Sequence, residues 1–479
     1  MSSRWRPEVV AALADVAGPE QVLTSPEDMY VYGYDGTAMV HHAPRAVVDI
    51  TDSAQIAPIM RLANELDFKV IPRGSGSGLS GGSVPVDDAV VLVLTRLNRI
   101  LEIYEDNLTA MVEPGVITQT LHTEVESRGL FYPPDPGSGK ISTLGGNIAE
   151  NSGGLRGLKY GLTKDYVMGI EVVLPNGETI WSGNKCVKDA AGYDLKHLFI
   201  GSEGTLGIFT KALLKLIPKP AAKKTMVAYF SSMRAAAEAV SAIIARKVIP
   251  ATVEFLDQVT MQCVEAYAKL GLNTSYGALL LIEVDGHPGQ VADEADTVMA
   301  VCRECGALEF AQAKDEAEAL KMAAARRVAF TALARVKPTT ILEDATVPRS
   351  ALPEMIDIIE ACARKYNLRV GTFGHAGDGN LHPTFLTDER DHEEIERVEK
   401  AFTEMFDGAL RLGGTISGEH GTGTVKMPFL ARQYNDATLT MMRTVKQMLD
   451  PRDILNPGKV LLPGRRFGER VEAVAGAVL

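Results

Sequence analysis

The chain has 479 residues, a length that predicts about three lobes rather than one small domain. Its 49 basic and 61 acidic residues give a net charge of −12. This excess of acid argues against nucleic acid or an anionic membrane as the main partner, because both require a basic face. The five cysteines are scattered, which argues against a disulfide scaffold or an iron–sulfur cluster. No apolar stretch approaches the ~20 residues of a membrane-spanning helix, and residues 1–6 lack a signal-peptide core. We therefore expect a cytoplasmic protein with no transmembrane segment.

The first part of the chain alternates helical and strand patterns. The predicted elements are a helix at 7–16, a strand at 45–50, a helix at 53–66, strands at 69–72, 89–94 and 111–113, a helix at 118–129 and a hairpin at 167–181 around an Asn-Gly turn. The stretch 133–161 is dense in Gly, Pro, Ser and Asn, so we expect a long folded loop there.

A short basic, proline-rich segment at 218–224 predicts a domain boundary. The pattern beyond it predicts a separate α+β domain, with strands at 225–230, 252–256 and 278–284 and helices at 233–246, 258–270 and 290–305. Two glycine-rich loops are expected at 371–382 and 413–423, and a helix begins the tail 439–462.

The glycine-rich segment Arg73–Gly82 invites a dinucleotide-binding interpretation. That fingerprint requires a helix after the loop and an acidic residue about 20 positions later, and only the preceding strand is present. We therefore expect no helix N-terminus to face this loop. Alternating glycines can instead turn successive N–H groups inward and bind an anion such as a pyrophosphate. A mobile surface loop is the alternative interpretation of this segment alone.

Two further glycine-rich surfaces, at 133–154 and 201–208, favour the ligand interpretation. Three such loops within one lobe are typical of a cradle for a large, flat, polyoxygenated ligand. The alternative is that all three loops merely turn the chain.

These three loops resemble the FAD-binding loops of the vanillyl-alcohol-oxidase flavoprotein superfamily, and within it the FAD-linked 2-hydroxy-acid dehydrogenases, over residues 44–463. The latter family includes the glycolate oxidase FAD subunit, D-lactate dehydrogenase and D-2-hydroxyglutarate dehydrogenase. No histidine lies in 73–84, so the resemblance implies non-covalent FAD. By resemblance the FAD-contacting residues are Pro72, Arg73, Gly74, Ser75, Gly76, Ser77, Gly78, Leu79, Ser80, Gly81, Gly82, Pro136, Ser142, Thr143, Gly145, Gly146, Asn147, Asn151, Ser152, Gly153, Gly154, Glu203, Gly204, Gly207, Ile208 and Asn456.

The resemblance also implies an α+β fold. It consists of a two-subdomain FAD-binding domain of PCMH type at 1–218, an α+β substrate and metal-binding cap domain at 219–425, and a C-terminal helical segment at 426–479 that returns to the FAD domain.

A second candidate site contains His375 and His382, seven residues apart around glycines, and the pair Glu419-His420. Two imidazoles and a carboxylate form a divalent-metal set with open positions, which is typical of a catalytic site. Turn histidines bonded to backbone are the alternative interpretation. The resemblance assigns His375, His382 and Glu419 to the metal and His420 to the catalytic base. Zinc, manganese and iron suit this set equally well. Adjacent residues point to opposite sides of a strand, so a shared site requires a local irregularity, which Gly418 and Gly421 permit.

A substrate carboxylate favours a guanidinium partner. The resemblance assigns this catalytic-site role to Arg326, with the neighbouring Arg327 as the alternative. The 2-hydroxyglutarate enzymes of the family add a threonine and a lysine for a distal carboxylate, where this chain has Phe330 and Leu342. An apolar pair cannot pair a second carboxylate, so we expect a small monocarboxylate substrate such as glycolate or D-lactate.

These features predict an FAD- and metal-dependent 2-hydroxy-acid dehydrogenase. A D-2-hydroxyglutarate-type dehydrogenase, a metal-dependent hydrolase or lyase without redox chemistry, and an FAD-binding scaffold subunit are the alternatives. The chain lacks an NAD fingerprint, so reduced flavin must pass its electrons to an iron–sulfur subunit, another electron-transfer protein or a quinone. Such a partner would form an oligomer with this chain and hold it peripherally at the inner membrane. A homo-oligomer is also compatible with these features.

Overall fold

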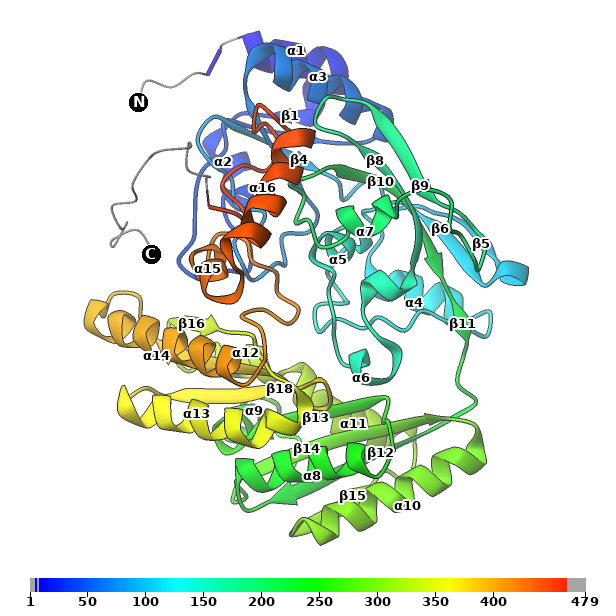
Figure 1. Ribbon diagram of the computed structural model, residues 1–479, viewed down its shortest axis with the longest axis vertical. Coiled ribbons are helices and arrows are strands. Elements are labelled where there is room, and N and C mark those ends of the chain that lie inside the picture. The colour runs from blue at the N-terminus through cyan, green and yellow to red at the C-terminus, as the bar shows by residue number, and fades with distance from the viewer. Residues whose placement is uncertain (1–4, 7, 463–479) are drawn as a thin grey trace.

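The computed structural model describes residues 5, 6 and 8–462. Residues 1–4 and 7 of the expected FAD-binding domain, and residues 463–479 of the expected C-terminal segment, lie outside the described residues. Figure 1 shows two lobes, an upper one built from the N-terminal segments and the last helices, and a lower one built from the middle of the chain.

The upper lobe contains a four-stranded sheet in the order β1-β2-β4-β3, with strands Val22–Leu23, Ala46–Asp49, Ala89–Val93 and Lys69–Arg73. Strands β2, β4 and β3 are parallel, and β4 is buried along its whole length, as its unbroken apolar sequence predicts. Helix α3 (Ile56–Leu66) buries one apolar stripe in this core, and helix α1 (Glu8–Ala17) packs beside it.

The second sheet of the upper lobe is antiparallel, in the order β5-β6-β10-β8-β9. Its strands are Ile100–Tyr104, Thr109–Val112, Ile208–Lys215, Val167–Val173 and Thr179–Gly183. The predicted hairpin at 167–181 is confirmed as β8 and β9. The lobe also contains α2 (Pro26–Met29), α4 (Thr118–Glu126), α5 (Leu144–Glu150), α6 (Gly157–Tyr160), α7 (Leu195–Phe199) and the strand pair β7 (Leu130–Phe131) and β11 (Ile217–Pro218).

The lower lobe is one large sheet in the order β15-β12-β14-β13-β18-β19-β16. Its strands are Glu309–Gln312, Ala222–Phe230, Ala278–Gly286, Thr252–Asp257, Val370–His375, Asn380–Thr387 and Thr339–Leu342, and β17 (Ala345–Thr346) also pairs with β19. One face packs against α8 (Met233–Ala245), α10 (Pro288–Glu304), α13 (Leu352–Lys365) and α14 (His392–Arg411). The other face packs against α9 (Gln258–Ala268), α11 (Glu316–Arg327) and α12 (Ala329–Leu333). Both faces are covered, so successive residues of β12 enter two different cores.

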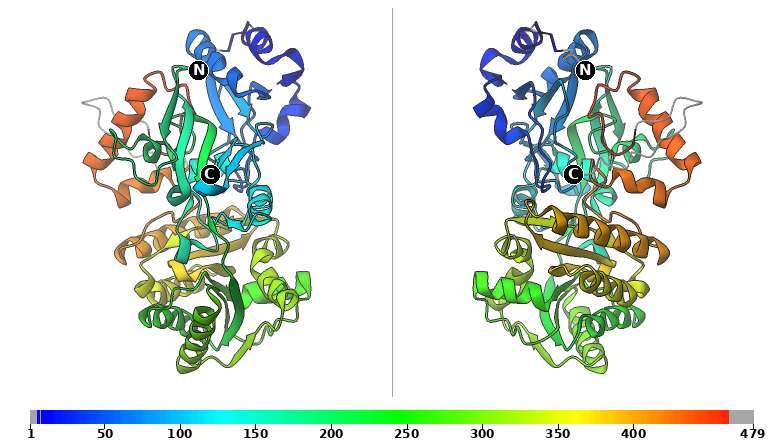
Figure 2. Two further views of the ribbon diagram at one scale, coloured as in Figure 1. Left: turned by 90° about the vertical axis from the view of Figure 1, so that its right-hand side faces the viewer. Right: turned by 90° about the vertical axis from the view of Figure 1, so that its left-hand side faces the viewer.

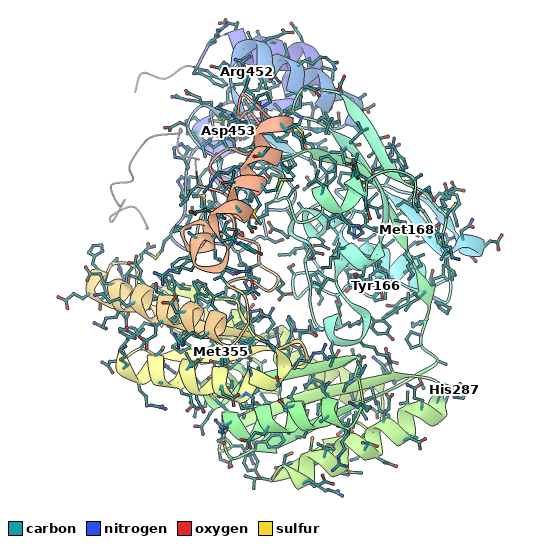
Figure 3. The ribbon with its side chains drawn as sticks, in the orientation of Figure 1. Tyr166, Met168, His287, Met355, Arg452 and Asp453 are labelled. Atoms are coloured by element: carbon teal, nitrogen blue, oxygen red, sulfur yellow. The ribbon has the colours of Figure 1, made fainter. Side chains whose placement is uncertain are left out.

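The chain returns to the upper lobe after α14, through α15 (Leu430–Gln433) and α16 (Asp436–Leu449). Both turned views show these helices beside the N-terminal sheets (Figure 2). Leu455 forms a parallel bridge with Val70 of β3, and Lys69 Nζ donates to the backbone oxygens of Arg452 and Asp453 at 3.2 and 2.8 Å (Figure 3). The last described residues therefore pack into the same core as the first strands of the chain.

Two predicted loops are wrong in part. The stretch 133–161 contains helices α5 and α6, and the stretch 371–382 forms strands β18 and β19 around one tight turn. Glycine is present there because atoms of neighbouring residues lie close. A Cβ on Gly145 would lie 2.6 Å from Pro114, and one on Gly371 would lie 2.6 Å from Leu333. Within residues 5, 6 and 8–462, no helix is long and apolar enough to cross a bilayer.

Candidate active site

A cavity of about 580 Å³ lies between the two lobes. The glycine loop after β3, the start of α5 and the segment 203–209 line it from the upper lobe. The strands and helices of the lower lobe contribute Arg326, Arg327, Phe330, Thr331, Leu342, Phe373, His375 and His382. The loop 413–423, called the returning loop because the chain then goes back to the upper lobe, contributes Glu419 and His420. The volume is within the range of ~300–1,000 Å³ that is typical of ligand sites. Both candidate sites therefore open into one space.

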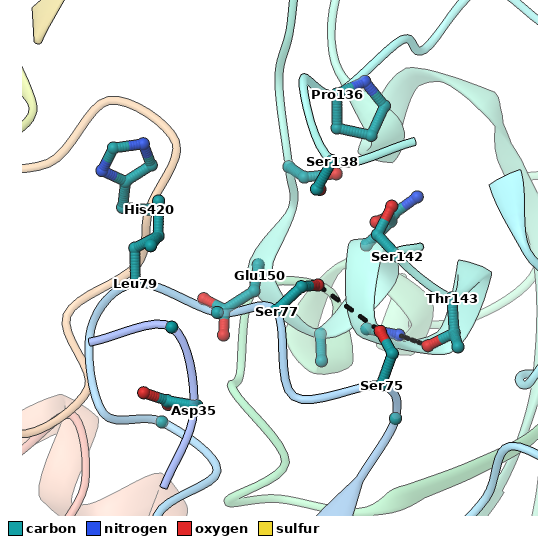
Figure 4. A pocket seen from close by; sticks show the side chains of 18 of the residues that line it. Asp35, Ser75, Ser77, Leu79, Pro136, Ser138, Ser142, Thr143, Glu150 and His420 are labelled. Carbon is teal, nitrogen blue, oxygen red and sulfur yellow. Dashed lines mark hydrogen bonds between the residues drawn. The ribbon is translucent and has the colours of Figure 1, made fainter. Parts of the chain in front are cut away.

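Helix α5 begins directly against the glycine loop, so the expectation that no helix N-terminus faces this loop is wrong. A Cβ on Gly74 would collide with the hydroxyl of Thr143, which caps α5 by accepting from Gly146 N at 3.3 Å. Figure 4 shows Ser75 and Ser77 beside this cap, with His420 on the opposite side of the cavity. The helix comes from a distant part of the chain, which is why the local fingerprint could not reveal it.

Most of the predicted FAD-contacting residues line this cavity. The exceptions are Ser80, Gly81, Asn151, Gly153, Gly154 and Asn456. Asn456 links the glycine loop to the segment 203–209, because its side-chain amide donates to Gly82 O at 2.9 Å and to Glu203 O at 2.7 Å. The Arg73 guanidinium donates to Ser83 Oγ at 3.2 Å. The glycine loop therefore offers mainly backbone and hydroxyl groups to a ligand.

Two buried carboxyl groups, those of Glu203 and Glu150, lie between the glycine loop and the returning loop. Glu203 accepts from the amides of Thr422 and Gly423, both at 2.6 Å. Glu150, which the sequence analysis missed, lines the cavity next to Glu203, and its Oε2 has no hydrogen-bond partner. Burial raises the pKa of Glu150 well above its usual value, and the Glu203 carboxylate adds to the effect. No charge pattern marks Glu150 in the sequence, where it follows a plain helical stretch.

The pairing of β18 with β19 brings His375 and His382 together. Phe373 lies opposite His382, and residues 373 and 375 share one face of β18, so the two histidines are diagonal neighbours. Their rings are perpendicular, at 89°, with centroids 5.3 Å apart. Glu419 Oε1 lies 3.0 Å from His375 Nε2 and 3.3 Å from His382 Nε2.

This set fits a divalent cation by its donor chemistry. One ligand atom from each of His375, His382 and Glu419 lies within 4.8 Å of the others. Burial opposes protonation of His375, but the Glu254 and Glu419 carboxylates outweigh it and raise the pKa of His375 to about 10. Burial likewise opposes ionisation of Glu419, but the two histidines lower its pKa well below the usual value. A metal would displace the shared proton, because metal ligands must be deprotonated.

Asp344 stabilises the backbone turn that places Glu419 and His420 in one site. Its Oδ2 accepts from the amides of Gly418, Glu419 and His420 at 2.8, 3.0 and 3.0 Å. Lys426 Nζ lies 3.3 Å from the same oxygen. Three successive amides pointing at one carboxylate require a tight turn rather than a strand, so the adjacent side chains no longer point to opposite sides. The sequence analysis missed Asp344, although it stands in the segment that follows Leu342.

His420 stacks on His382, with centroids 4.9 Å apart and the rings 15° from parallel. Its Nδ1 lies 4.0 Å from Asp344 Oδ2. Burial lowers the pKa of His420 to about 4, with Asp344 opposing the shift. The imidazole is therefore neutral near pH 7 and able to accept a proton.

Arg326 is buried at the cavity wall, whereas Arg327 is exposed at its edge. Arg326 Nε lies 2.5 Å from Glu254 Oε2, and its guanidinium carbon lies 4.6 Å from the Phe373 ring centroid. Glu254 also accepts from His375 Nδ1 at 2.7 Å. Glu254 was not predicted as a site residue, although a carboxylate in the middle of the apolar strand β13 is an unusual feature that could have marked it.

Comparisons with known proteins agree with this architecture. Residues 44–183 match a family model described as an FAD binding domain, and residues 219–460 match one described as the C-terminal domain of FAD linked oxidases. The glycolate oxidase subunit GlcD of Bacillus subtilis (strain 168) is 52% identical over 96% of this chain and 98% of its own. The D-lactate dehydrogenase of Anaerostipes hadrus is 34% identical over 95% of this chain and 97% of its own.

Solved structures support the fold. A p-cresol methylhydroxylase with bound substrate superimposes with a TM-score of 0.79 at 19% identity, covering 95% of this chain and 96% of its own. A 4-ethylphenol oxidase from Gulosibacter chungangensis gives a TM-score of 0.77 at 18% identity, covering 95% and 96%. The predicted fold class and the resemblance to FAD-linked oxidoreductases are thus confirmed. The chain belongs to the family of FAD-linked oxidases and is an FAD-dependent oxidoreductase.

Proposed function

We propose that the chain oxidises a small 2-hydroxy monocarboxylate, glycolate or D-lactate, to the 2-oxo acid. The observation that carries this proposal is the shared cavity, in which the glycine loops of the upper lobe face His375, His382, Glu419, His420 and Arg326. Such a reaction requires a hydride acceptor, a base and a carboxylate partner around one carbon atom, and the two lobes contribute these groups from opposite sides.

The proposed roles follow from the positions of the side chains. Arg326 or its neighbour Arg327 binds the substrate carboxylate. His420 is neutral near pH 7, so a ring nitrogen is free to take the hydroxyl proton. Two electrons leave the α-carbon as a hydride, for which FAD would supply the acceptor when bound. His375, His382 and Glu419 would hold a divalent metal (zinc, manganese or iron), which would acidify and orient the hydroxyl group.

The lining of the cavity supports a short substrate. Phe330 and Leu342 lie in its wall, and neither side chain offers a charge to a distal carboxylate. Thr331 also lines the wall, but a neutral hydroxyl cannot neutralise a carboxylate. A D-2-hydroxyglutarate-type activity is therefore the less favoured alternative.

The reduced flavin must pass its electrons onward. Two of the relatives are named as subunits of glycolate oxidase, in Bacillus subtilis and Escherichia coli. By analogy we propose that an electron-acceptor protein binds this chain, with a quinone as the alternative acceptor.

Anaerobic reduction of the flavin by a panel of D- and L-2-hydroxy acids tests the proposal. We expect glycolate or D-lactate to bleach the protein-bound flavin with a higher kcat/KM than D-2-hydroxyglutarate. A higher value for D-2-hydroxyglutarate would refute the assignment of a monocarboxylate substrate, and no bleaching by any hydroxy acid would refute the proposed function itself.

A further inference from the structure

We infer that Glu254 is a positioning residue that contacts, and fixes the orientation of, both the metal ligand His375 and the substrate arginine Arg326. The inference rests on the proposed function, because it assumes that His375 binds a metal and that Arg326 binds the substrate carboxylate. Glu254 lies in the middle of β13, and its side chain is fully buried. It therefore reaches the cavity only through these two neighbours.

The two carboxylate oxygens of Glu254 have different partners. Oε1 accepts from His375 Nδ1 at 2.7 Å, and Oε2 lies 2.5 Å from Arg326 Nε. The register of the sheet explains this arrangement, because Phe255 of β13 pairs with Gly374 of β18, which places residue 254 next to residue 375. One side chain thus contacts both the candidate metal ligand and the candidate substrate arginine.

The contact with His375 determines which ring nitrogen is available to a metal. Glu254 holds a proton on Nδ1, so the proton on Nε2, which faces His382 and Glu419, is the one that a metal would displace. Carboxylate partners of this kind fix the orientation of metal-binding histidines and raise their basicity, and their loss typically costs about 10–100-fold in metal affinity or activity.

The contact with Arg326 offsets the cost of burying a guanidinium beside Phe373. Glu254 contacts Arg326 at Nε, at the base of the planar group, so the terminal nitrogens are left for a second carboxylate. Without Glu254 the buried guanidinium would carry an unpaired charge, and its orientation over Phe373 would be less restricted.

The variant Glu254→Gln tests this double role, with Mn²⁺ titrated into FAD-loaded protein and the free ion measured by electron paramagnetic resonance. We expect Mn²⁺ to bind about 10–100-fold more weakly than to the wild type. Turnover should show a lower kcat and a higher KM, and saturating Mn²⁺ should restore kcat while KM stays raised, because the metal cannot replace the Arg326 contact.

The matched control is Glu394→Gln in the same lobe. Glu394 is also buried, accepts from Thr387 Oγ1 at 2.6 Å and lies 3.3 Å from Lys337, but it does not line the cavity. This control should keep wild-type Mn²⁺ affinity and KM. If Glu254→Gln fails to load FAD, the shorter but charged Glu254→Asp replaces it and should weaken Mn²⁺ binding in the same way.

Two outcomes would overturn the inference in distinguishable ways. Mn²⁺ binding and KM within twofold of wild type in Glu254→Gln would refute the positioning role and leave the proposed function standing. Failure of the wild-type protein to bind any divalent ion would refute the metal site, and with it both the proposed mechanism and this inference.

Discussion

The two sides of the cavity are built by opposite means. The FAD-binding side consists of loops and the start of a short helix, and it presents mostly glycines and small hydroxyl side chains from three separate stretches of sequence. The side that faces it presents imidazoles and carboxylates from two paired strands and one turn, and the buried carboxylates of Glu254 and Asp344 hold His375 and the turn. A large ligand that contacts backbone needs room, whereas a small cation and a short substrate need side chains fixed in direction. If this comparison is right, variants on the two sides will fail in different ways.

The largest effect is expected for His382→Ala. Loss of one of the three donors should abolish metal binding and lower the rate of flavin reduction by roughly 10³-fold, since Lewis-acid polarisation contributes several kcal/mol. The bound FAD should remain, because His382 stands on the opposite side of the cavity. Rapid-mixing reduction and the flavin absorbance of the purified variant measure the two quantities. Loss of FAD together with activity would break the comparison.

His420→Ala should lower kcat by about 10²–10⁴-fold, the usual contribution of a general base, while Mn²⁺ affinity stays near that of the wild type. Steady-state kinetics and a Mn²⁺ titration of one preparation separate these effects. A near-normal kcat would disqualify His420 as the base, and a loss of Mn²⁺ affinity equal to that of His382→Ala would make it a ligand.

Gly153→Ala tests a glycine of the upper lobe that lies against the candidate metal ligand Glu419. A Cβ there would lie 2.7 Å from Glu419 Oε2, so the carboxylate must shift. We expect Mn²⁺ affinity to fall about 10-fold or more with little change in FAD content, since small misplacements of such groups are costly. Gly289→Ala in helix α10 is the control, because the nearest atom to its Cβ, His287 Nδ1, is 3.9 Å away. Equal Mn²⁺ affinity in both variants would contradict the contact.

The smallest effect is expected for Gly76→Ala in the glycine loop. Gly76 has φ +71°, and a Cβ would collide with the Arg73 guanidinium. Strain of about 1–2 kcal/mol should weaken FAD binding roughly tenfold and leave Mn²⁺ affinity unchanged. Fluorescence titration of the apoprotein with FAD measures this change. A loss of Mn²⁺ affinity without loss of FAD would show that the two sides do not act separately.

The pattern of each sequence segment determined the helices and strands of both lobes more than the contacts between them. Glycine clusters mark close backbone approach wherever they occur, and the hydrophobic periods of the strands and helices are local properties. Hence the hairpin β8–β9 and the elements from β12 to α10 could be predicted within a few residues. The strands at 371–382 could not, because their glycines reflect a contact of Gly371 with Leu333, which is distant in sequence, and the close approach of β19 across one tight turn.

The candidate ligands His375, His382 and Glu419 were recognisable in the sequence because histidines and carboxylates among glycines are rare. The roles of their buried partners Glu254 and Asp344 were not, since the role of a buried acidic residue depends on the groups that surround it. Sheet register places Glu254 beside His375, and one turn directs three amides at Asp344. The sequence by itself determines the residue types and the local hydrophobic periods. The pairing of buried charges depends on which strands and turns lie side by side, and only the tertiary structure decides this.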